Sequence, residues 1–455
     1  MPERSHDELY AIADALIADA QDGEQVEVYV GSRVDTDVDV VNATLHSLTV
    51  ATSEGVGIRV INDHRQGYAS VGSLDIDLAR DALAQARSNA RWAAPDEFIG
   101  LVDLATADAL PAAELDVYDP AVLSVPTADK VEMAFKLEQD TLARDPRIRG
   151  IETSAYGDVV GSSVIVSTEG IRVASRRSAA SASVVAMAGE GVETRTGYGF
   201  TVGRSPLALD LSEAADDAAE RTLRLLGAKQ GPSATLPIVF DPLVSASLIG
   251  LIAAACNGEA LIKGRSMFVN RLGEAVAAGG VTLIEDPTDA RFFSAGARDG
   301  EGVVTRRTEL ISEGVFAAAL NNAYTGRRSG AGTTGSAARG GYGSAPGVGA
   351  RALRVVPGNR SQEEIIAGID QGLYVQSLNG LHSGASTVSG DFSVGADGLM
   401  IRDGRLAEPV REMTIASTLQ KMLLGISEIG ADEIWLPGSA VGVTLLIDSM
   451  SVSGS

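Results

Sequence analysis

Histidine, cysteine and carboxylate side chains could build a hydrolytic metal site, but the sequence holds few of the first two. It has four histidines and one cysteine in 455 residues. A catalytic zinc needs at least three protein ligands and an open coordination position. No two histidines stand at the i, i+4 spacing that would place two ligands on one helix face. We expect His46 and His64 to be surface or strand-edge residues; the alternative is a metal site that they form together with an acid. Cys256 lies in an apolar run, which is typical of a small buried hydrophobe.

Serine chemistry is not indicated by the residue pattern either. No G-x-S-x-G sequence occurs, and His382 has Ser383 and Ser386 only as sequence neighbours, which rarely form a triad. Asp299 and Glu301 flank a tight turn, where solvated carboxylates are the ordinary expectation and a role in gripping a substrate or partner is the alternative. We keep His382, Asp299 and Glu301 as candidate substrate-binding residues.

Residues 326–351 are the most glycine-rich stretch of the chain. Gly330, Gly332 and Gly335 form a literal G-x-G-x-x-G, but a dinucleotide site needs that motif between a buried strand and the start of a helix. A further glycine cluster follows here, so the pattern argues against a nucleotide cofactor. The stretch is either a mobile surface loop or a loop that lines a substrate cavity, with Gly332 and Gly335 as candidate substrate-binding positions.

The composition excludes several classes of partner. Apolar residues make up 45% of the chain and charged residues 21%, as in ordinary globular proteins. The formal net charge is -23 and no stretch is a basic block, so we expect no nucleic-acid partner. No run approaches the roughly 18 apolar residues of a membrane span, and the charged N-terminus does not resemble an export signal. With one cysteine, these features predict a cytoplasmic protein without a membrane partner.

The first 230 residues alternate helical and strand-like patterns in an order that occurs twice. Each unit has a helix, short alternating runs separated by turns such as Gly31-Ser32 and residues 53–55, and a second helix, which is typical of an antiparallel meander. The units cover residues 1–92 and 126–230, and residues 93–125 are typical of a linker. The order favours an α-βββββ-α duplication, with coincidence between two ordinary α+β segments as the alternative.

The remaining chain, residues 234–455, predicts a second, mostly antiparallel β domain. A helix at 241–257 should open with Asp241 as N-cap and Pro242 as its first residue. We also predict a helix from Met413 to Ile429 and a buried strand within Gly442 to Val452. The chain is therefore expected to be an α+β protein of two domains, 1–230 and 234–455.

Several motifs, in this order along the chain, resemble the TldD/PmbA family, once called modulators of DNA gyrase. The resemblance spans nearly the whole sequence, although Gly300 departs from the second acid of the family's "D-D-E-G" step. The motifs that carry it are Val56-Gly57-Ile58-Arg59-Val60, Arg65-Gln66-Gly67-Tyr68-Ala69-Ser70, Lys263-Gly264-Arg265-Ser266-Met267-Phe268, Leu272-Gly273, Arg298-Asp299-Gly300-Glu301-Gly302-Val303, Gly390-Asp391-Phe392-Ser393 and Ser451-Val452-Ser453-Gly454.

The resemblance also implies where zinc chemistry would lie. In the TldD branch, H-E-x-x-x-H on a helix supplies two zinc ligands and a general base. The matching positions here are Ile249, Gly250 and Ala254, none of which can bind metal or transfer a proton, and no cysteine follows Cys256 where that branch has a further ligand. The chain therefore resembles the TldE/PmbA branch, which lacks the zinc motif, so no catalytic or metal-binding residue and no cofactor is expected in this chain.

For function, the resemblance implies a non-catalytic subunit of a cytosolic TldD/TldE zinc metallopeptidase complex. A TldD-type partner would carry the zinc, and this chain would form half of a chamber that admits unfolded peptides. Two alternatives remain open. One is a standalone peptide- or protein-binding homodimer, and the other is a hydrolase with an unrecognised site near His382.

Overall fold

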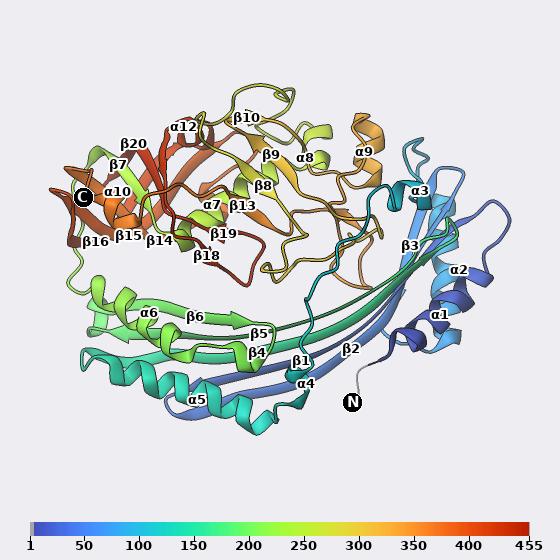
Figure 1. Ribbon diagram of the computed structural model, residues 1–455, viewed down its shortest axis with the longest axis horizontal. Coiled ribbons are helices and arrows are strands. Elements are labelled where there is room, and N and C mark those ends of the chain that lie inside the picture. Colours follow the sequence, from blue (N-terminus) through green and yellow to red (C-terminus); the bar gives the residue numbers. More distant parts are fainter. Residues whose placement is uncertain (1–3, 455) are drawn as a thin grey trace.

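The N-terminal part of the chain is organised around one antiparallel sheet with the strand order β3-β2-β1-β4-β5-β6. In the computed structural model, which describes residues 4–454, its long strands curve around the C-terminal part of the chain (Figure 1). Each half of the sheet comes from one helix, three strands and one helix, in that order. The first half is α1 (His6–Ala18), β1 (Gln25–Val41), β2 (Thr44–Asn62), β3 (Arg65–Val71) and α2 (Ile76–Trp92); the second is α5 (Thr127–Arg144), β4 (Ile148–Ser167), β5 (Arg172–Ala188), β6 (Arg195–Gly203) and α6 (Leu211–Arg224).

Each half of the sheet has three long strands, whereas the sequence predicted five short ones. The turns predicted at Gly31-Ser32 and at residues 53–55 are wrong, because Gly31 pairs with Gly55 and Ser32 with Glu54 inside the β1–β2 ladder. β4 pairs along the other side of β1, so both sides of this stretch are held in ladder hydrogen bonds. Local turn propensity is therefore overridden by pairing with two neighbours. The same merging of runs occurs in β4 and β5.

A glycine in the third strand of each half lets a helix pack directly on the sheet. A Cβ atom added at Gly67 of β3 would lie 2.0 Å from the Ala86 carbonyl oxygen of α2. One added at Gly197 of β6 would lie 2.4 Å from the Thr222 nitrogen of α6. Any side chain at either position would push its helix off the sheet. The Gly-Tyr steps of the sequence therefore mark equivalent close approaches in the two halves.

The predicted linker is packed between the two parts of the chain rather than free. It contains two short helices, α3 (Leu104–Ala107) and α4 (Ala121–Ser124). The Ser178 N–H of β5 donates to the Val117 carbonyl (3.0 Å), and the Val304 N–H donates to the Ala107 carbonyl (2.9 Å). The segment is thus fixed to the N-terminal sheet at one point and to the C-terminal part at another.

The C-terminal part contains the largest apolar core and is β-rich, as predicted. Its main sheet has the order β16-β15-β14-β7-β20-β17, and an additional β16–β20 pairing closes five of these strands into a ring; only β14–β7 is parallel. The apolar helix α7 packs against this sheet and supplies much of the core. Its strands are β7 (Ala234–Phe240), β8 (Leu283–Glu285), β9 (Thr308–Ser312), β10 (Val315–Phe316), β11 (Ala337–Ala338), β12 (Gly347–Val348), β13 (Leu353–Val355), β14 (Gln371–Asn379), β15 (Asp391–Arg402), β16 (Arg405–Thr418), β17 (Ile426–Ile429), β18 (Ile434–Trp435), β19 (Val441–Gly442) and β20 (Leu445–Ser453); its helices are α7 (Pro242–Ala255), α8 (Gly258–Ile262), α9 (Ala323–Ser329), α10 (Gln362–Ile366), α11 (Leu381–Gly384) and α12 (Leu419–Leu424).

The helix predicted from Met413 to Ile429 is wrong. β16 continues through Thr418 and pairs with β15, and only the short helix α12 follows before β17. Met413 and Ile415 are buried at alternate positions, which is the period of a strand whose one face meets the core. Thr418 then caps α12 by accepting a hydrogen bond from the Lys421 N–H.

The overall class is the α+β arrangement that the sequence predicted, with antiparallel sheets in the N-terminal part. Within residues 4–454, none of the helices is both long and apolar enough to cross a membrane.

Candidate functional site

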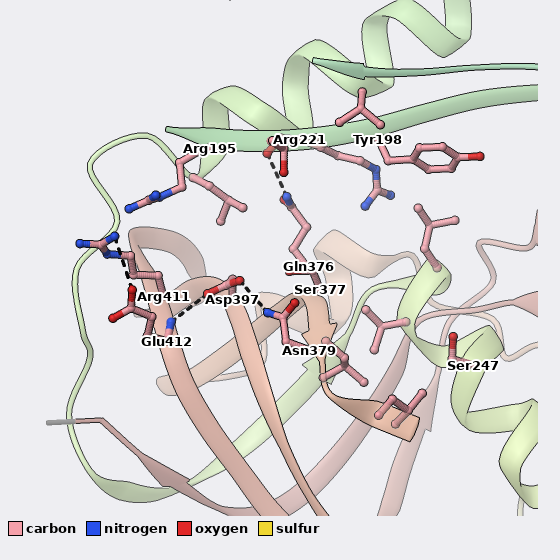
Figure 2. Close-up of a pocket in the computed structure, with 18 of the residues that line it drawn as sticks. Arg195, Tyr198, Arg221, Ser247, Gln376, Ser377, Asn379, Asp397, Arg411 and Glu412 are labelled. Carbon is pink, nitrogen blue, oxygen red and sulfur yellow. Dashed lines mark hydrogen bonds and ion pairs between the residues drawn. The ribbon is translucent and has the colours of Figure 1, made fainter. Parts of the chain in front are cut away.

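A cavity of about 640 Å³ lies between the N-terminal sheet and the C-terminal ring of strands (Figure 2). β6 and α6 form one wall, and α7, β14, β15 and β16 form the other. Its polar lining residues are Thr194, Arg195, Thr196, Tyr198, Arg221, Ser247, Gln376, Ser377, Asn379, Asp397, Arg411 and Glu412.

The wall nearest α6 is fixed by a buried carboxylate. Arg221 forms an ion pair with Asp241 (3.1 Å), which is also the N-cap of α7, and the Tyr374 hydroxyl donates to the same carboxylate (2.5 Å). Burial, and then the Asp241 charge, raise the pKa of Tyr374, so this hydroxyl stays protonated and remains a donor. The Gln376 amide nitrogen donates to the Arg221 carbonyl (2.9 Å). The position of α7 is therefore tied to that of α6.

The opposite wall is a short polar network on β14, β15 and β16. The Asp397 carboxylate accepts from the Asn379 side chain (3.1 Å) and from the Glu412 N–H (2.8 Å). Glu412 has a φ of 53°, a strained conformation for a residue with a side chain, and the Asp397 bond holds its backbone there. Arg411 next to it reaches Glu193 (3.2 Å), which lies just before β6. These contacts join the mouth of the cavity to the edge of the N-terminal sheet.

Three polar atoms around the cavity lack a hydrogen-bond partner within residues 4–454. They are Nε of Arg195, Nε of Arg411 and Oε1 of Gln376, and Gln376 is 6% exposed. Buried polar groups are normally paired, and an unpaired one costs free energy. All three atoms are buried within the walls of the cavity, so the open surface of the cavity is formed by the other polar groups and by apolar residues such as Leu243 and Leu378.

β6 gives the cavity a second means of holding an extended chain. It is an end strand of the N-terminal sheet, so its outward N–H and C=O groups have no strand partner in the part of the chain that the structure describes, residues 4–454. Thr194 to Tyr198 line the cavity, and Tyr198 stacks on Phe200 with ring centroids 5.6 Å apart. Burial raises the pKa of Tyr198. A free edge next to a partly exposed aromatic pair is the arrangement that binds extended peptides by strand addition.

α7 has no metal-ligating or proton-transferring side chain at the three positions where the family motif would fall. Ile249 is 3% exposed, with its side chain in the apolar core. Gly250 and Ala254 lie on the more open side, where a Cβ atom added at Gly250 would have nothing within 4 Å. The two ends of the motif are thus an aliphatic core residue and an exposed methyl group.

The candidate carboxylates Asp299 and Glu301 are not solvated, so the ordinary expectation for that turn is wrong. They are 4% and 1% exposed. Glu301 accepts from Arg59 of β2 (3.1 Å) and from the Ala323 N–H at the start of α9 (2.9 Å). Asp299 accepts from the backbone N–H groups of Glu301, Val303 and Ala337. Both carboxylates are occupied by the protein itself.

This turn belongs to a buried ionic cluster that joins the two parts of the chain. Arg59 also pairs with Glu27 of β1 (2.7 Å), and Arg339 pairs with the other oxygen of Glu27 (2.5 Å). Burial alone would raise the pKa of Glu27, but the guanidinium groups of Arg59 and Arg339 outweigh it and lower that pKa. Burial, and then the Glu301 charge, raise the pKa of Asp299 to about 7. The cluster connects β1 and β2 to the 299–301 turn and to the glycine-rich stretch.

The glycine-rich stretch is docked rather than loose over much of its length. α9 ends at Gly330 (φ 75°), and the Tyr68 hydroxyl of β3 donates to the Tyr342 carbonyl (2.5 Å). Gly332 is exposed and open, with nothing within 4 Å of an added Cβ atom. Gly335 is buried, and an added Cβ atom would lie 2.8 Å from the Val304 carbonyl oxygen. Neither glycine lines the cavity in Figure 2.

His382 lies on the exposed surface of α11, next to the cavity residue Leu381 but not among the lining residues. The Ser383 hydroxyl donates to the Gly380 carbonyl (3.2 Å), and the Ser386 hydroxyl accepts from the N–H groups of Val388 and Ser389. Both serines therefore serve local turns. His46 and His64 are also exposed, as the sequence suggested.

Comparison with known families covers most of the chain. Three models match in order: PmbA/TldA metallopeptidase domain 1 at residues 26–90, the central domain at 120–226 and the C-terminal domain at 233–454. The chain belongs to the PmbA/TldD family.

Individual PmbA/TldD relatives agree with this assignment. The chain is 26% identical to "Metalloprotease PmbA" of Escherichia coli O157:H7 over 98% of this chain and 95% of that protein. A crystal structure from Thermotoga maritima, described as a modulator of a DNA gyrase, has a TM-score of 0.89 and 25% identity, and covers 98% of this chain and all of the other. The crystal structure of TldE from Thermococcus kodakarensis has a TM-score of 0.88 at 22% identity, over 98% and 99% of the two chains, and shows the shared fold.

The family name implies a metal, but the residues of this PmbA/TldD chain do not fit one on α7. Zinc takes nitrogen, sulfur or oxygen donors, and Ile249, Gly250 and Ala254 offer none in their side chains. Within residues 4–454, no group of three or more His, Cys, Asp or Glu side chains is placed to hold an ion. Cys256 is fully buried, and burial raises the pKa of its thiol, so it stays an uncharged apolar group.

Sequence reasoning missed the residues that line the cavity. Gln376 and Asn379 follow the buried run Leu373–Val375 on β14, and Arg411 and Glu412 interrupt the alternation of β16. Polar residues inside a buried strand are a signal that could have singled out Gln376. Nothing in the sequence places β14 opposite β6, because they are far apart along the chain.

Proposed function

We propose that this chain is the non-catalytic, TldE/PmbA-type subunit of a cytosolic TldD/TldE zinc metallopeptidase complex. The observation that carries the proposal is the composition of α7. By the resemblance to the family, this helix would correspond to its zinc-binding helix, and the three motif positions would be Ile249, Gly250 and Ala254. A helix without ligands or a general base cannot activate water.

The role of this chain in the complex is to form half of the substrate chamber. The cavity between β6 and β14 supports this, because its polar lining and the free β6 edge suit an extended, unfolded peptide. The outward N–H and C=O groups of β6 would pair with the main chain of the peptide. Main-chain contacts of this kind recognise a peptide with little regard to its sequence, which suits a general peptide-processing complex.

Catalytic chemistry in that complex would belong to the TldD-type subunit, in which zinc would supply an activated water and a glutamate would serve as the base. This chain contributes no proton transfer at the α7 positions. Its own groups hold the peptide and, together with the partner, exclude bulk water.

The proposal is tested by the metal content and the binding partner of the natural protein. Tag-free protein should contain far less than one zinc per chain by elemental analysis. A pull-down from the native host should recover a zinc-containing subunit of similar size. Stoichiometric zinc or iron in the isolated chain would overturn the assignment, and so would the recovery of no zinc-containing subunit under conditions that preserve complexes.

A further inference from the structure

The sequence contains two Asn-Gly steps, Asn257-Gly258 and Asn379-Gly380. Asparagine is a thermolabile residue, and a following glycine favours its deamidation, because no side chain hinders attack of the glycine nitrogen on the asparagine amide. Glycine also adopts the unusual backbone conformations that a cyclic product needs. In a folded chain, the reaction is controlled by how firmly the amide and that nitrogen are held.

The Asn379-Gly380 step is open. Asn379 is the last residue of β14 and lines the cavity (Figure 2), and both it and Gly380 are exposed. Within residues 4–454, the Asn379 side chain makes a single hydrogen bond, from Nδ2 to the Asp397 carboxylate (3.1 Å). In the same part of the chain, the Gly380 N–H donates to no acceptor. One hydrogen bond therefore has to break before the Gly380 nitrogen can reach the amide carbon.

The Asn257-Gly258 step is held at every polar atom that the reaction uses. The Asn257 Oδ1 caps α8 by accepting from two N–H groups of that helix (2.9 and 3.2 Å), and Nδ2 donates to the Val348 carbonyl (3.0 Å). Gly258 is buried, and its N–H donates to the Leu320 carbonyl (2.8 Å). The same dipeptide thus occurs once locked and once free, which gives an internal control within one chain.

We propose that Asn379 is a site of spontaneous deamidation in the folded protein, with water as the only co-reactant. The Gly380 nitrogen loses its proton to solvent and forms a bond to the side-chain carbonyl carbon of Asn379. The bond from that carbon to Nδ2 breaks, and ammonia leaves with a proton taken from solvent. Water then opens the cyclic imide at either carbonyl, which leaves aspartate or isoaspartate at position 379. The reaction belongs to this chain alone and holds whether or not a TldD-type subunit binds.

Conversion at position 379 places two carboxylates against each other on one wall of the cavity. The Asp397 carboxylate accepts both from the Asn379 amide and from the Glu412 N–H (2.8 Å). A carboxylate at position 379 has no proton to donate, and like charges this close on paired strands repel. The displaced Asp397 then no longer holds Glu412 at its φ of 53°. Deamidation therefore adds a negative charge to this wall and loosens it.

The first experiment incubates the full chain in mildly alkaline buffer and follows both Asn-Gly steps by peptide mapping and mass spectrometry, with an unincubated sample as background. The peptide with Asn379 should gain the mass that separates an amide from a carboxyl group. Its initial rate should be at least about tenfold higher than that of the Asn257 peptide, because the hydrogen bonds that hold the Asn257 step raise its barrier. In urea, where neither step is held, the two rates should be similar. No conversion of Asn379, equal rates in the folded chain, or a difference that persists in urea would overturn the proposal.

The second experiment tests the effect on the cavity wall with substitutions. Asn379→Asp supplies the carboxylate directly and should unfold at a lower urea concentration than wild type. Adding Asp397→Asn gives the pair one donor and one charge again, so the double variant should recover most of the lost midpoint. Asn379→Gln is the control for the reaction, because it keeps an amide whose longer side chain cyclises far more slowly. An unchanged midpoint in Asn379→Asp, or no recovery in the double variant, would contradict the loosening of the wall.

Discussion

One region of this molecule lacks a family motif and another keeps one, and the two regions have opposite physical character. α7 is apolar where the family's zinc motif would fall, with Ile249 in the core and Gly250 and Ala254 on its open side. The 299–301 turn keeps its acids, and these are buried and engaged by Arg59 and by backbone N–H groups. α7 has no ionisable side chain that could bind a metal or transfer a proton. The acids of the 299–301 turn are ionisable, but they are already engaged by partners within the chain.

The difference separates motifs that do chemistry from motifs that maintain the shared architecture. The buried cluster of Glu27, Arg59, Glu301 and Arg339 joins the N-terminal sheet to the C-terminal part. The zinc motif is needed only by a subunit that hydrolyses peptides. Retention of one and loss of the other is what a non-catalytic chamber subunit would show.

The largest effect is expected from breaking the buried cluster. Arg59→Ala leaves Glu27 and Glu301 buried without their shared partner and should lower the free energy of unfolding by about 3–5 kcal/mol. Arg33→Ala on the same sheet is the control, because Arg33 is 60% exposed in its ion pair with Asp35, so its loss should cost roughly 0–1 kcal/mol. Urea titrations of both variants give the comparison. Equal midpoints would mean that the cluster does not stabilise the junction.

A pH-dependent effect is expected from Asp299 in the same cluster. Its folded pKa of about 7 lies above its ordinary value of 3.8, so between those values the folded state binds more protons than the unfolded state. The contribution of Asp299 to stability is therefore fully present below about pH 4 and is lost as the pH rises through 7. Asp299→Asn cannot ionise, so the stability of the variant relative to wild type should improve from pH 5 to pH 8. Urea midpoints measured across that range should converge or cross, and a constant difference would contradict the burial of an ionisable Asp299.

The smallest effect is expected on α7. Gly250 stands inside a helix with open space around an added Cβ atom, so Gly250→Ala should stabilise the chain by roughly 0.5–1 kcal/mol. Thermal unfolding of the isolated chain measures this. Destabilisation would show that the glycine is required by a contact within the chain. Unchanged or increased stability together with lost activity of the reconstituted complex would instead place a peptide or the partner against this face.

The features of the fold that could be predicted from the sequence are those that depend on the local pattern of residues. The start of α7 at Asp241-Pro242 and the repeated helix-strand-helix order follow from capping chemistry and hydrophobic period, and both are observed. The predicted helix over 413–429 failed because Met413 and Ile415 suit a strand as well as a helix. Pairing with β15, which lies elsewhere in the chain, decided between them.

The candidate site was harder to predict because its contacts are distant in sequence. Asp299 and Glu301 looked solvated, since the partner that buries Glu301, Arg59, is 242 positions away. The hydrogen bond from the Gln376 side chain to the Arg221 carbonyl joins the two walls of the cavity across 155 positions. The absence of ligand side chains at Ile249, Gly250 and Ala254 could be recognised from the sequence, because it needs only the local motif.

The most direct test of the account is one peptide-cleavage assay on three samples: this chain alone, a TldD-type subunit alone, and the mixture. This chain alone should be inert, and the mixture should cleave unfolded peptide in a chelator-sensitive way. Placing His at Ile249 and Ala254 with Glu at Gly250 should not make the isolated chain active, because Ile249 lies in the core and no cysteine follows Cys256. If this chain alone accounts for the whole activity of the mixture, the assignment as a non-catalytic subunit is wrong.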